Sequence, residues 1–198
     1  MNTVSTQKRR YELKARAEGQ QKTRGRIVAA AAQLHQEVGV RNTTVADIAR
    51  RAGVQRVTVY NHFADLDELL PACSAHWLER HPMPDLSEAF AIEDPRERVC
   101  VALRRLYPWY RENERMQLNV QGDRNTVPEL ERWMARSADV RLAELAGALA
   151  AGFGLEGEAA ERARALARLA LDFWTWRRLS TEGLDDEQAA DLMSGRLP

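Results

Sequence analysis

The sequence of 198 residues contains few cysteines, few lysines and no long apolar run. The two cysteines, Cys73 and Cys100, are too few for a disulfide framework and fit a reducing compartment, so we expect a cytoplasmic protein. No run is apolar enough to cross a membrane, and no charged-then-apolar secretion signal is present, so we expect no membrane partner. Strand-like alternation is also missing. These absences predict an all-α fold, with about nine helices.

Common signatures of catalysis are missing as well. We find no glycine-rich phosphate loop, no nucleophile elbow and no complete set of metal ligands. Cys73 and His76 lie one helical turn apart and could share a metal, but no second pair completes such a site. We therefore expect a protein that is not an enzyme and that holds no cofactor and no metal. A helical enzyme is a distant alternative.

Charge is distributed unevenly along the chain. Residues 1–63 carry 12 Lys or Arg and 4 Asp or Glu, a net charge of +8, whereas residues 64–198 carry 17 and 25, a net charge of −8. All three lysines precede residue 23. A basic head on an acidic body favours contact between one end and a polyanion. Residues 1–21 are predicted to be a basic arm, disordered in the free protein, that reaches phosphates or a minor groove when DNA is present.

Two short helices joined by a tight turn are predicted between Thr43 and Phe63. Thr44, with Asp47 three residues later, is a start signal for the first helix, and Gly53 is placed to end it. Polar residues at the front of the second helix, on an apolar two-helix corner, are what a helix-turn-helix needs to read DNA. The apolar residues of the first helix are Val45, Ile48, Ala49 and Ala52, and those of the second are Val54, Val57, Val59 and Phe63.

The pattern T-x-x-x-I-A-x-x-A-G-V-x-x-x-T-x-Y-x-H-F, which begins at Thr44, resembles the DNA-binding signature of the TetR/AcrR family of bacterial transcription regulators. The resemblance covers residues 24–70. It implies that Gln55, Arg56 and Thr58 read bases and that Thr44, Tyr60 and His62 hold the DNA backbone. Leu66 departs from the family, which usually has a phosphate-binding lysine there; the basic arm could replace it. The expected DNA-binding residues are Lys22, Arg24, Thr44, Gln55, Arg56, Val57, Thr58, Tyr60, Asn61 and His62.

The domain organisation follows from these assignments. After the arm at 1–21, a helix-turn-helix domain is predicted at 22–65, and a body for ligand binding and dimerisation at 66–198. The predicted helices include Lys22 to Val38, a linking helix at 66–80 capped by Asp65, a helix beginning at Asp94-Pro95, Pro128 to about Ala150, a helix at 158–180, and Asp185 to Ser194.

The helix predicted at 158–180 is apolar nearly all round, which indicates burial on more than one side. One of those sides is expected to meet a second copy of the chain, which is also how the family that the sequence resembles forms dimers. The expected dimer residues are Leu166, Leu169, Ala170, Phe173 and Leu192.

Aromatic, methionine and amide residues gather around Pro108, where the helix is expected to kink. As single residues they fit an ordinary core; as a set, and with the family resemblance, they favour a pocket for a small, largely apolar effector. The expected lining is Trp109, Tyr110, Asn113, Met116, Trp133, Met134, Phe173 and Trp176.

The sequence thus predicts a homodimeric transcription regulator, a repressor that a ligand releases from a palindromic operator in double-stranded DNA. The alternative is a DNA-binding regulator without a small-molecule ligand, controlled by its abundance or by a protein partner. A solidly packed body would favour that alternative.

Overall fold

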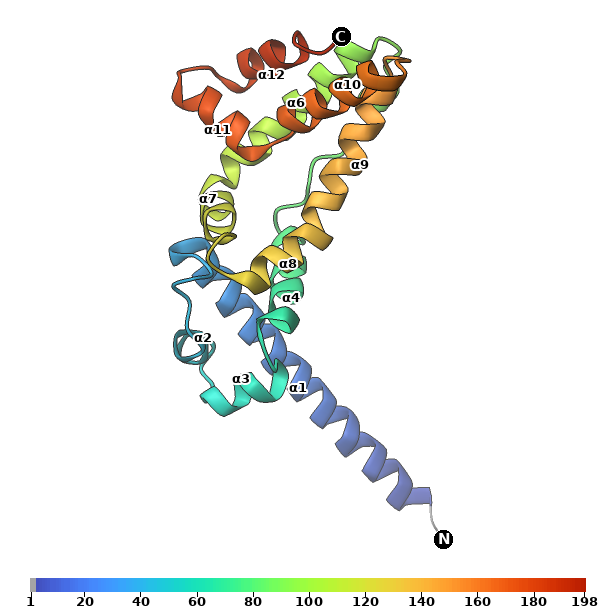
Figure 1. Ribbon diagram of the computed structural model, residues 1–198. Helices are drawn as coiled ribbons and strands as arrows, with labels where there is room; N and C mark the ends of the chain where they lie inside the picture. Colours follow the sequence, from blue (N-terminus) through green and yellow to red (C-terminus); the bar gives the residue numbers. More distant parts are fainter. Residues whose placement is uncertain (1–2) are drawn as a thin grey trace.

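The computed structural model describes residues 3–198, with side chains from Lys14 onward, and its regular structure over this range is α-helical (Figure 1). The helices are α1 Thr3–Val38, α2 Val45–Ala52, α3 Arg56–His62, α4 Leu66–Leu78, α5 Ser87–Phe90, α6 Pro95–Glu112, α7 Glu114–Asp123, α8 Pro128–Arg136, α9 Ala138–Ala151, α10 Gly157–Ala170, α11 Phe173–Thr181 and α12 Asp186–Ser194. The all-α class is confirmed. Twelve helices are described instead of about nine, because two predicted helices are broken and α5 is an added single turn.

The head consists of α1–α3, and the first turns of α4 complete its core. Thr44 caps α2 by accepting a hydrogen bond from the Asp47 amide at 3.1 Å, and Gly53 ends the helix in the left-handed conformation with φ +64°. Asp65 caps α4 in the same way. These three predicted signals are confirmed. The apolar faces of α1–α4 close one small core, whose members include Ile27, Ile48, Val59, Phe63 and Leu69.

The first helix is longer than the sequence pattern predicts. It begins at Thr3 and not near Lys22, so the segment expected to be a disordered tail continues α1 in the described backbone. The segment contains no proline and is rich in Lys, Arg, Glu and Gln, which lose little side-chain freedom in a helix. Lys8, Arg9 and Arg10 of the expected basic arm lie outside the described side chains.

The body places its main core far from the N-terminus, among α6 and α9–α12 (Figure 1). A smaller core joins head to body, where Val40 and Leu70 meet Leu130 and Met134. Helix α6 begins at the predicted Asp94 cap, runs through Pro108 and ends at Glu112. The chain then departs from helical geometry at Asn113 and starts α7, which returns toward the head and contacts α1.

Two predicted helices are broken. The helix expected from Pro128 to Ala150 stops at Ser137, whose backbone leaves the helical region and whose hydroxyl donates to the Trp133 carbonyl at 2.7 Å. The helix expected at 158–180 stops before Asp172, whose carboxylate caps α11 by accepting from the amides of residues 174 and 175. Both residues favour local hydrogen bonds over a helix interior, and each break lets two short helices pack at an angle.

Candidate functional site

The outer face of α3 is free in the described structure. Val57 and Tyr60 are each 57% exposed, whereas Val59 is buried and fixes the helix to the head core. Val57 was expected on the buried side, but residues two apart on a helix point to nearly opposite faces, so Val57 and Val59 cannot both face the core. The other exposed candidates are Gln55, Arg56 and Asn61, and the half-buried ones are Thr58 and His62.

Thr44 is held within the head. Its hydroxyl donates to the carboxylate of Asp47 as well as accepting from the Asp47 amide. The hydrogen bond from Thr44 is the largest cause that lowers the pKa of Asp47, and Arg50 adds an ion pair. Thr44 therefore serves first to begin α2, and its side chain is already bonded where a free phosphate ligand was expected.

Two basic candidates on α1 lie at the base of the N-terminal segment. Lys22 is exposed, and the guanidinium of Arg24 lies 4.3 Å from the centre of the Phe63 ring, directly after α3. Arg24 is thereby brought beside the end of the helix whose outer face is free. Positive charge from α1 is thus placed next to the exposed side chains of α3.

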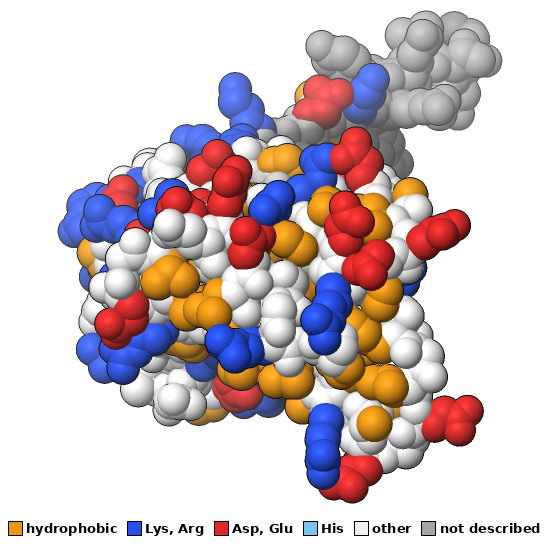
Figure 2. Space-filling view, turned by 90° about the horizontal axis from the view of Figure 1, so that it is seen from above, with side chains coloured by type: hydrophobic (Ala, Val, Ile, Leu, Met, Phe, Trp, Pro, Cys, Tyr) orange, Lys and Arg blue, Asp and Glu red, His pale blue; other side chains and the backbone are white. Residues whose placement is uncertain are grey.

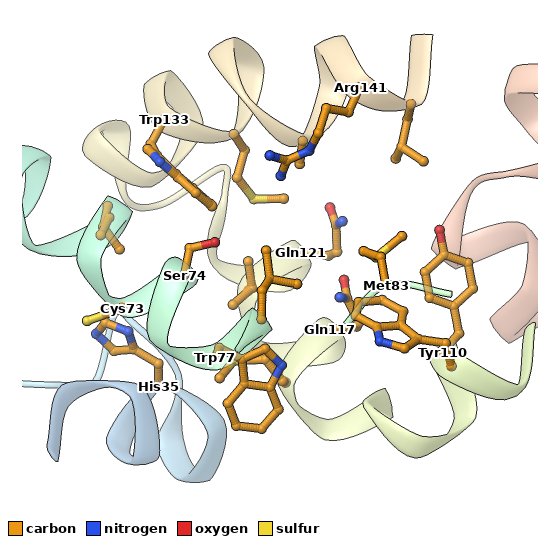
Figure 3. A pocket seen from close by; sticks show the side chains of 18 of the residues that line it. His35, Cys73, Ser74, Trp77, Met83, Tyr110, Gln117, Gln121, Trp133 and Arg141 are labelled. Atoms are coloured by element: carbon orange, nitrogen blue, oxygen red, sulfur yellow. The ribbon is translucent and has the colours of Figure 1, made fainter. Parts of the chain in front are cut away.

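A cavity of about 350 Å³ lies between the head and the body (Figure 3). Helices α1 and α4 supply one side of it, and α7, α8 and α9 supply the other. Much of its wall is apolar, including Val40, Leu70, Leu130, Met134 and Leu145. This size and composition are typical of small-molecule sites.

Five of the eight residues expected to line a pocket line this cavity: Trp109, Tyr110, Met116, Trp133 and Met134. Two of them come from α8, two from α6 and one from α7. Packing in three dimensions therefore brings together aromatic and methionine residues that the sequence places on separate helices.

The other three expected lining residues lie elsewhere. Asn113 is buried and donates to the Trp109 carbonyl at 2.9 Å, because it occupies the break between α6 and α7. Phe173 and Trp176 point into the main core, where their rings lie 5.5 and 5.8 Å from that of Tyr110. The break before α11 turns these two residues inward, away from the cavity.

Two polar ring nitrogens in the wall have no hydrogen-bond partner among the described residues: Nε2 of His35 and Nε1 of Trp77. His35 is 4% exposed, and burial lowers its pKa to about 4, so the ring is neutral near pH 7. This residue was not among those expected to line a pocket. Its spacing could have revealed it, since Ile27, Ala31 and His35 recur every four residues on the buried face of α1.

Further polar groups in the wall were also missed. Ser74 lies on α4, Gln117 and Gln121 follow each other by one turn on α7, and Arg141 lies on α9 (Figure 3). Among the described residues that line the cavity, none is Asp or Glu. Arg141 forms no ion pair within residues 14–198, so it is the one full charge in this wall near pH 7.

Helix α7 also holds the end of α1. Arg115, Asn119 and Asp123 recur every four residues on one face of α7. Arg115 donates to the Glu37 carbonyl at 2.8 Å, and Asn119 donates to the carbonyls of residues 35 and 36 at 3.1 and 2.7 Å. Asp123 accepts from the backbone amide of Arg41 at 3.0 Å. We call these three residues the α7 clamp.

Gly39 lets the clamp approach closely. Its φ of +87° is disfavoured for other residues, and a Cβ there would lie 2.5 Å from the Asp123 carboxylate. The backbone turn after α1 is therefore shaped to fit α7. Because His35 precedes this turn by one helical turn, the clamp and the cavity share the end of α1.

Two of the five expected dimer residues are buried within the single chain. Ala170 is 0% exposed and Phe173 is 2% exposed, because α10 and α11 both pack into the main core. Leu169 and Leu192 are exposed at 51% and 36%, and Trp174, which was not expected, is exposed at 46%. Leu166 is half-buried. Figure 2 looks onto this end of the body and shows apolar side chains among acidic and basic ones.

Other kinds of site find little support in the described residues. No group of three or more His, Cys, Asp or Glu there could hold a metal ion. None of the described helices is both long and apolar enough to span a membrane. Burial raises the pKa of Cys73 to about 12, which leaves its thiol protonated and a poor nucleophile near pH 7.

Comparison with known proteins supports the same division into head and body. The family described as "bacterial regulatory proteins, tetR family" matches residues 27–73. The chain is 40% identical over 84 residues to the HTH-type transcriptional regulator SrpR of Pseudomonas putida, which covers 42% of this chain and 38% of SrpR. It is 40% identical over 82 residues to the HTH-type transcriptional regulator TtgW, also of Pseudomonas putida, covering 41% of this chain and 60% of TtgW.

These matches span about two fifths of SrpR and three fifths of TtgW, so they concern mainly the head. Among solved structures, a transcriptional regulator from Rhodococcus sp. Rha1 superimposes with a TM-score of 0.63 at 22% identity, over 88% of this chain and 95% of that one. This likeness extends the shared fold to the body.

Proposed function

We propose that this chain, which belongs to the TetR family of bacterial regulatory proteins, is a transcription regulator that binds DNA as a homodimer and is released by a small ligand. The observation that carries the ligand-dependent part is the cavity of about 350 Å³ with walls from both head and body. A solid body was expected for a regulator without a ligand. The cavity therefore favours ligand control, acting on the chromosome in the cytoplasm.

Helix α3 is the proposed reading element. Its free outer face suits insertion into the major groove, where Gln55, Arg56 and Asn61 can form hydrogen bonds to base edges. Tyr60 and His62 are placed for the DNA backbone. The net charge of +8 on residues 1–63 adds attraction to phosphates that does not depend on sequence.

Helix α4 is one proposed route from ligand to DNA. It begins three residues after Phe63 and lines the cavity with Leu70, Ser74 and Trp77. A ligand that binds better when α4 is tilted would move α3 away from its DNA-bound position. By linkage, such a ligand lowers the affinity for DNA by as much as DNA lowers the affinity for the ligand.

The α7 clamp is a second proposed route. It ties the C-terminal end of α1 to the helix that carries Gln117 and Gln121 into the cavity. A ligand that displaces α7 therefore pulls on the backbone of α1, against which α2 packs. Both routes end at the head, which explains how one cavity could control the position of α3.

The proposed dimer uses the exposed apolar residues at the far end of the body, Leu169, Trp174 and Leu192. A two-fold axis there would present two α3 helices to the same face of DNA. Their half-sites would lie one helical turn apart, roughly 34–36 Å. The expected operator is accordingly palindromic.

Footprinting on DNA that flanks the protein's own gene tests the proposal. We expect a protected site with dyad symmetry, and Arg56→Ala should weaken its binding by about 1–3 kcal/mol and relax one base position. Arg162→Ala is the matched control, because Arg162 is an exposed arginine of α10 paired with Glu158 in the body. Sites without a dyad, or equal effects of both variants, would contradict the proposal.

A further inference from the structure

The cavity contains unused hydrogen-bonding capacity at its inner side. Nε1 of Trp77 can only donate, and in this structure it is buried without a partner among the described residues. Nε2 of His35, in the same wall, is also unpartnered, and the neutral ring can donate or accept. Buried polar groups without partners are costly and rare. The two nitrogens therefore mark a place where a polar group of a ligand would be bound.

The charge of the wall restricts the ligand further. Arg141 on α9 has no acidic neighbour among the cavity-lining residues that the structure describes. A cationic ligand would meet an arginine and no carboxylate, whereas a carboxylate would gain a charge-assisted hydrogen bond. Figure 3 shows Arg141 across the cavity from Trp77 and His35. The exposed position of Arg141 places it toward the mouth.

We propose that the cavity takes an apolar monocarboxylate whose other end carries a hydrogen-bond acceptor. Its carboxylate pairs with Arg141, its apolar middle lies against Trp109, Met116 and Met134, and its acceptor receives the N–H of Trp77. This assignment rests on the proposed function only in that both concern the same cavity. A volume of about 350 Å³ suits a molecule of about two rings.

The single arginine also distinguishes this class from more highly charged ligands. Arg104 and Arg105 are the other cations that the sequence places close to the Pro108 region. In the structure Arg104 pairs with Asp191 at 2.8 Å, Arg105 pairs with Glu88, and neither lines the cavity. One guanidinium at the mouth matches one carboxylate and leaves the second charge of a phosphate monoester unpaired.

Calorimetric titration of the DNA-free protein with matched probes tests the carboxylate. The probes are 2-naphthoate, the neutral alcohol 2-naphthalenemethanol and the cation 2-naphthylmethylammonium. We expect the wild type to bind the carboxylate about tenfold more tightly than the alcohol, and the cation most weakly. Arg141→Gln should remove this preference and leave the affinity for the alcohol unchanged. Arg136→Gln is the control, since Arg136 is exposed on α8 and does not line the cavity.

A second pair of probes tests the inner end. The wild type should bind 6-acetyl-2-naphthoate about fivefold more tightly than 2-naphthoate, because the ketone oxygen accepts the Trp77 N–H. Trp77→Phe keeps an aromatic ring and removes the donor, so it should abolish the advantage of the acetyl group. The preference for carboxylate over alcohol should persist in this variant.

Equal binding of carboxylate and alcohol by the wild type would overturn the proposal, as would a preference that survives Arg141→Gln or the binding of none of the probes. The outcome for the proposed function is separate, because release from the operator is measured in its own assay. Binding as expected without release leaves the ligand class standing and contradicts ligand control. Release by a ligand that ignores Arg141 does the reverse.

Discussion

The stability of this protein should fall on mild acidification because of His35. The side chain is buried in the wall of the cavity, and desolvation lowers its pKa from 6.5 to about 4, although the nearby charge of Asp123 raises it. Replacing His35 by Gln or by Leu removes this titration from both the folded and the unfolded chain. Gln keeps the polarity and Leu keeps an apolar volume, so an effect common to both variants reports the loss of the ionisable group.

The sign and size follow from linkage. Above pH 6.5 the ring is neutral in both states and costs nothing. Below that pH the unfolded chain takes up a proton that the folded chain resists until about pH 4, so acid favours unfolding. From pKa values of about 6.5 and 4, the wild type should lose about 2 kcal/mol between pH 7.5 and 5 through this residue alone.

Urea unfolding followed by circular dichroism at several pH values between about 5 and 7.5 measures this loss. The wild type and variants share all other titrating groups, so the difference between their pH profiles isolates His35. We expect both variants to lose about 2 kcal/mol less than the wild type over this range. Profiles that run parallel to the wild type would show that the folded protein accommodates a protonated His35, and the reasoning from burial would be wrong.

The clamp, the turn after α1 and the exposed end of the body can each be tested by substitution. Asn119→Ala removes two hydrogen bonds to α1 and should lower the stability by about 1–3 kcal/mol and weaken the effect of ligand on DNA binding, whereas Asn125→Ala, an exposed control beyond α7, should do neither in urea unfolding and DNA titration. Gly39→Ala should destabilise by more than about 1 kcal/mol, while Gly25→Ala, with open space on a helix, should stabilise by about 0.5–1 kcal/mol in the same unfolding assay. Trp174→Glu should convert the dimer to monomer in sedimentation; an intact dimer would place the interface elsewhere.

Local chemistry was enough to predict the reading element from the sequence. Thr44, Gly53 and Asp65 act on backbone groups within a few residues of themselves, so their roles as caps and stops can be recognised without knowing the fold. The same holds for Asp94 and for Asp185, which forms a capping box with Gln188. The face of α3 was misread only at Val57, where an apolar residue is exposed.

Long helices in the body were harder to predict, because their breaks depend on single polar residues. Ser137 and Asp172 lie within otherwise continuous helical patterns, and each ends a helix by binding a nearby backbone group. Helical periodicity by itself does not decide between bonding of this kind and an exposed polar side chain. The packing of α8 against α4 and of α11 against α12 does decide it.

Tertiary structure alone determined the cavity. The sequence indicated that aromatic and methionine residues would gather near α6 and α8, and five of them do line it. It did not indicate that His35, Trp77 and Arg141 would meet there, since they are far apart in the chain and come from three helices. Phe173 and Trp176 satisfy the same compositional pattern but fill the main core. Burial of apolar area rewards either place equally, so only the relative position of the helices determines which residues enclose a core and which enclose a ligand site.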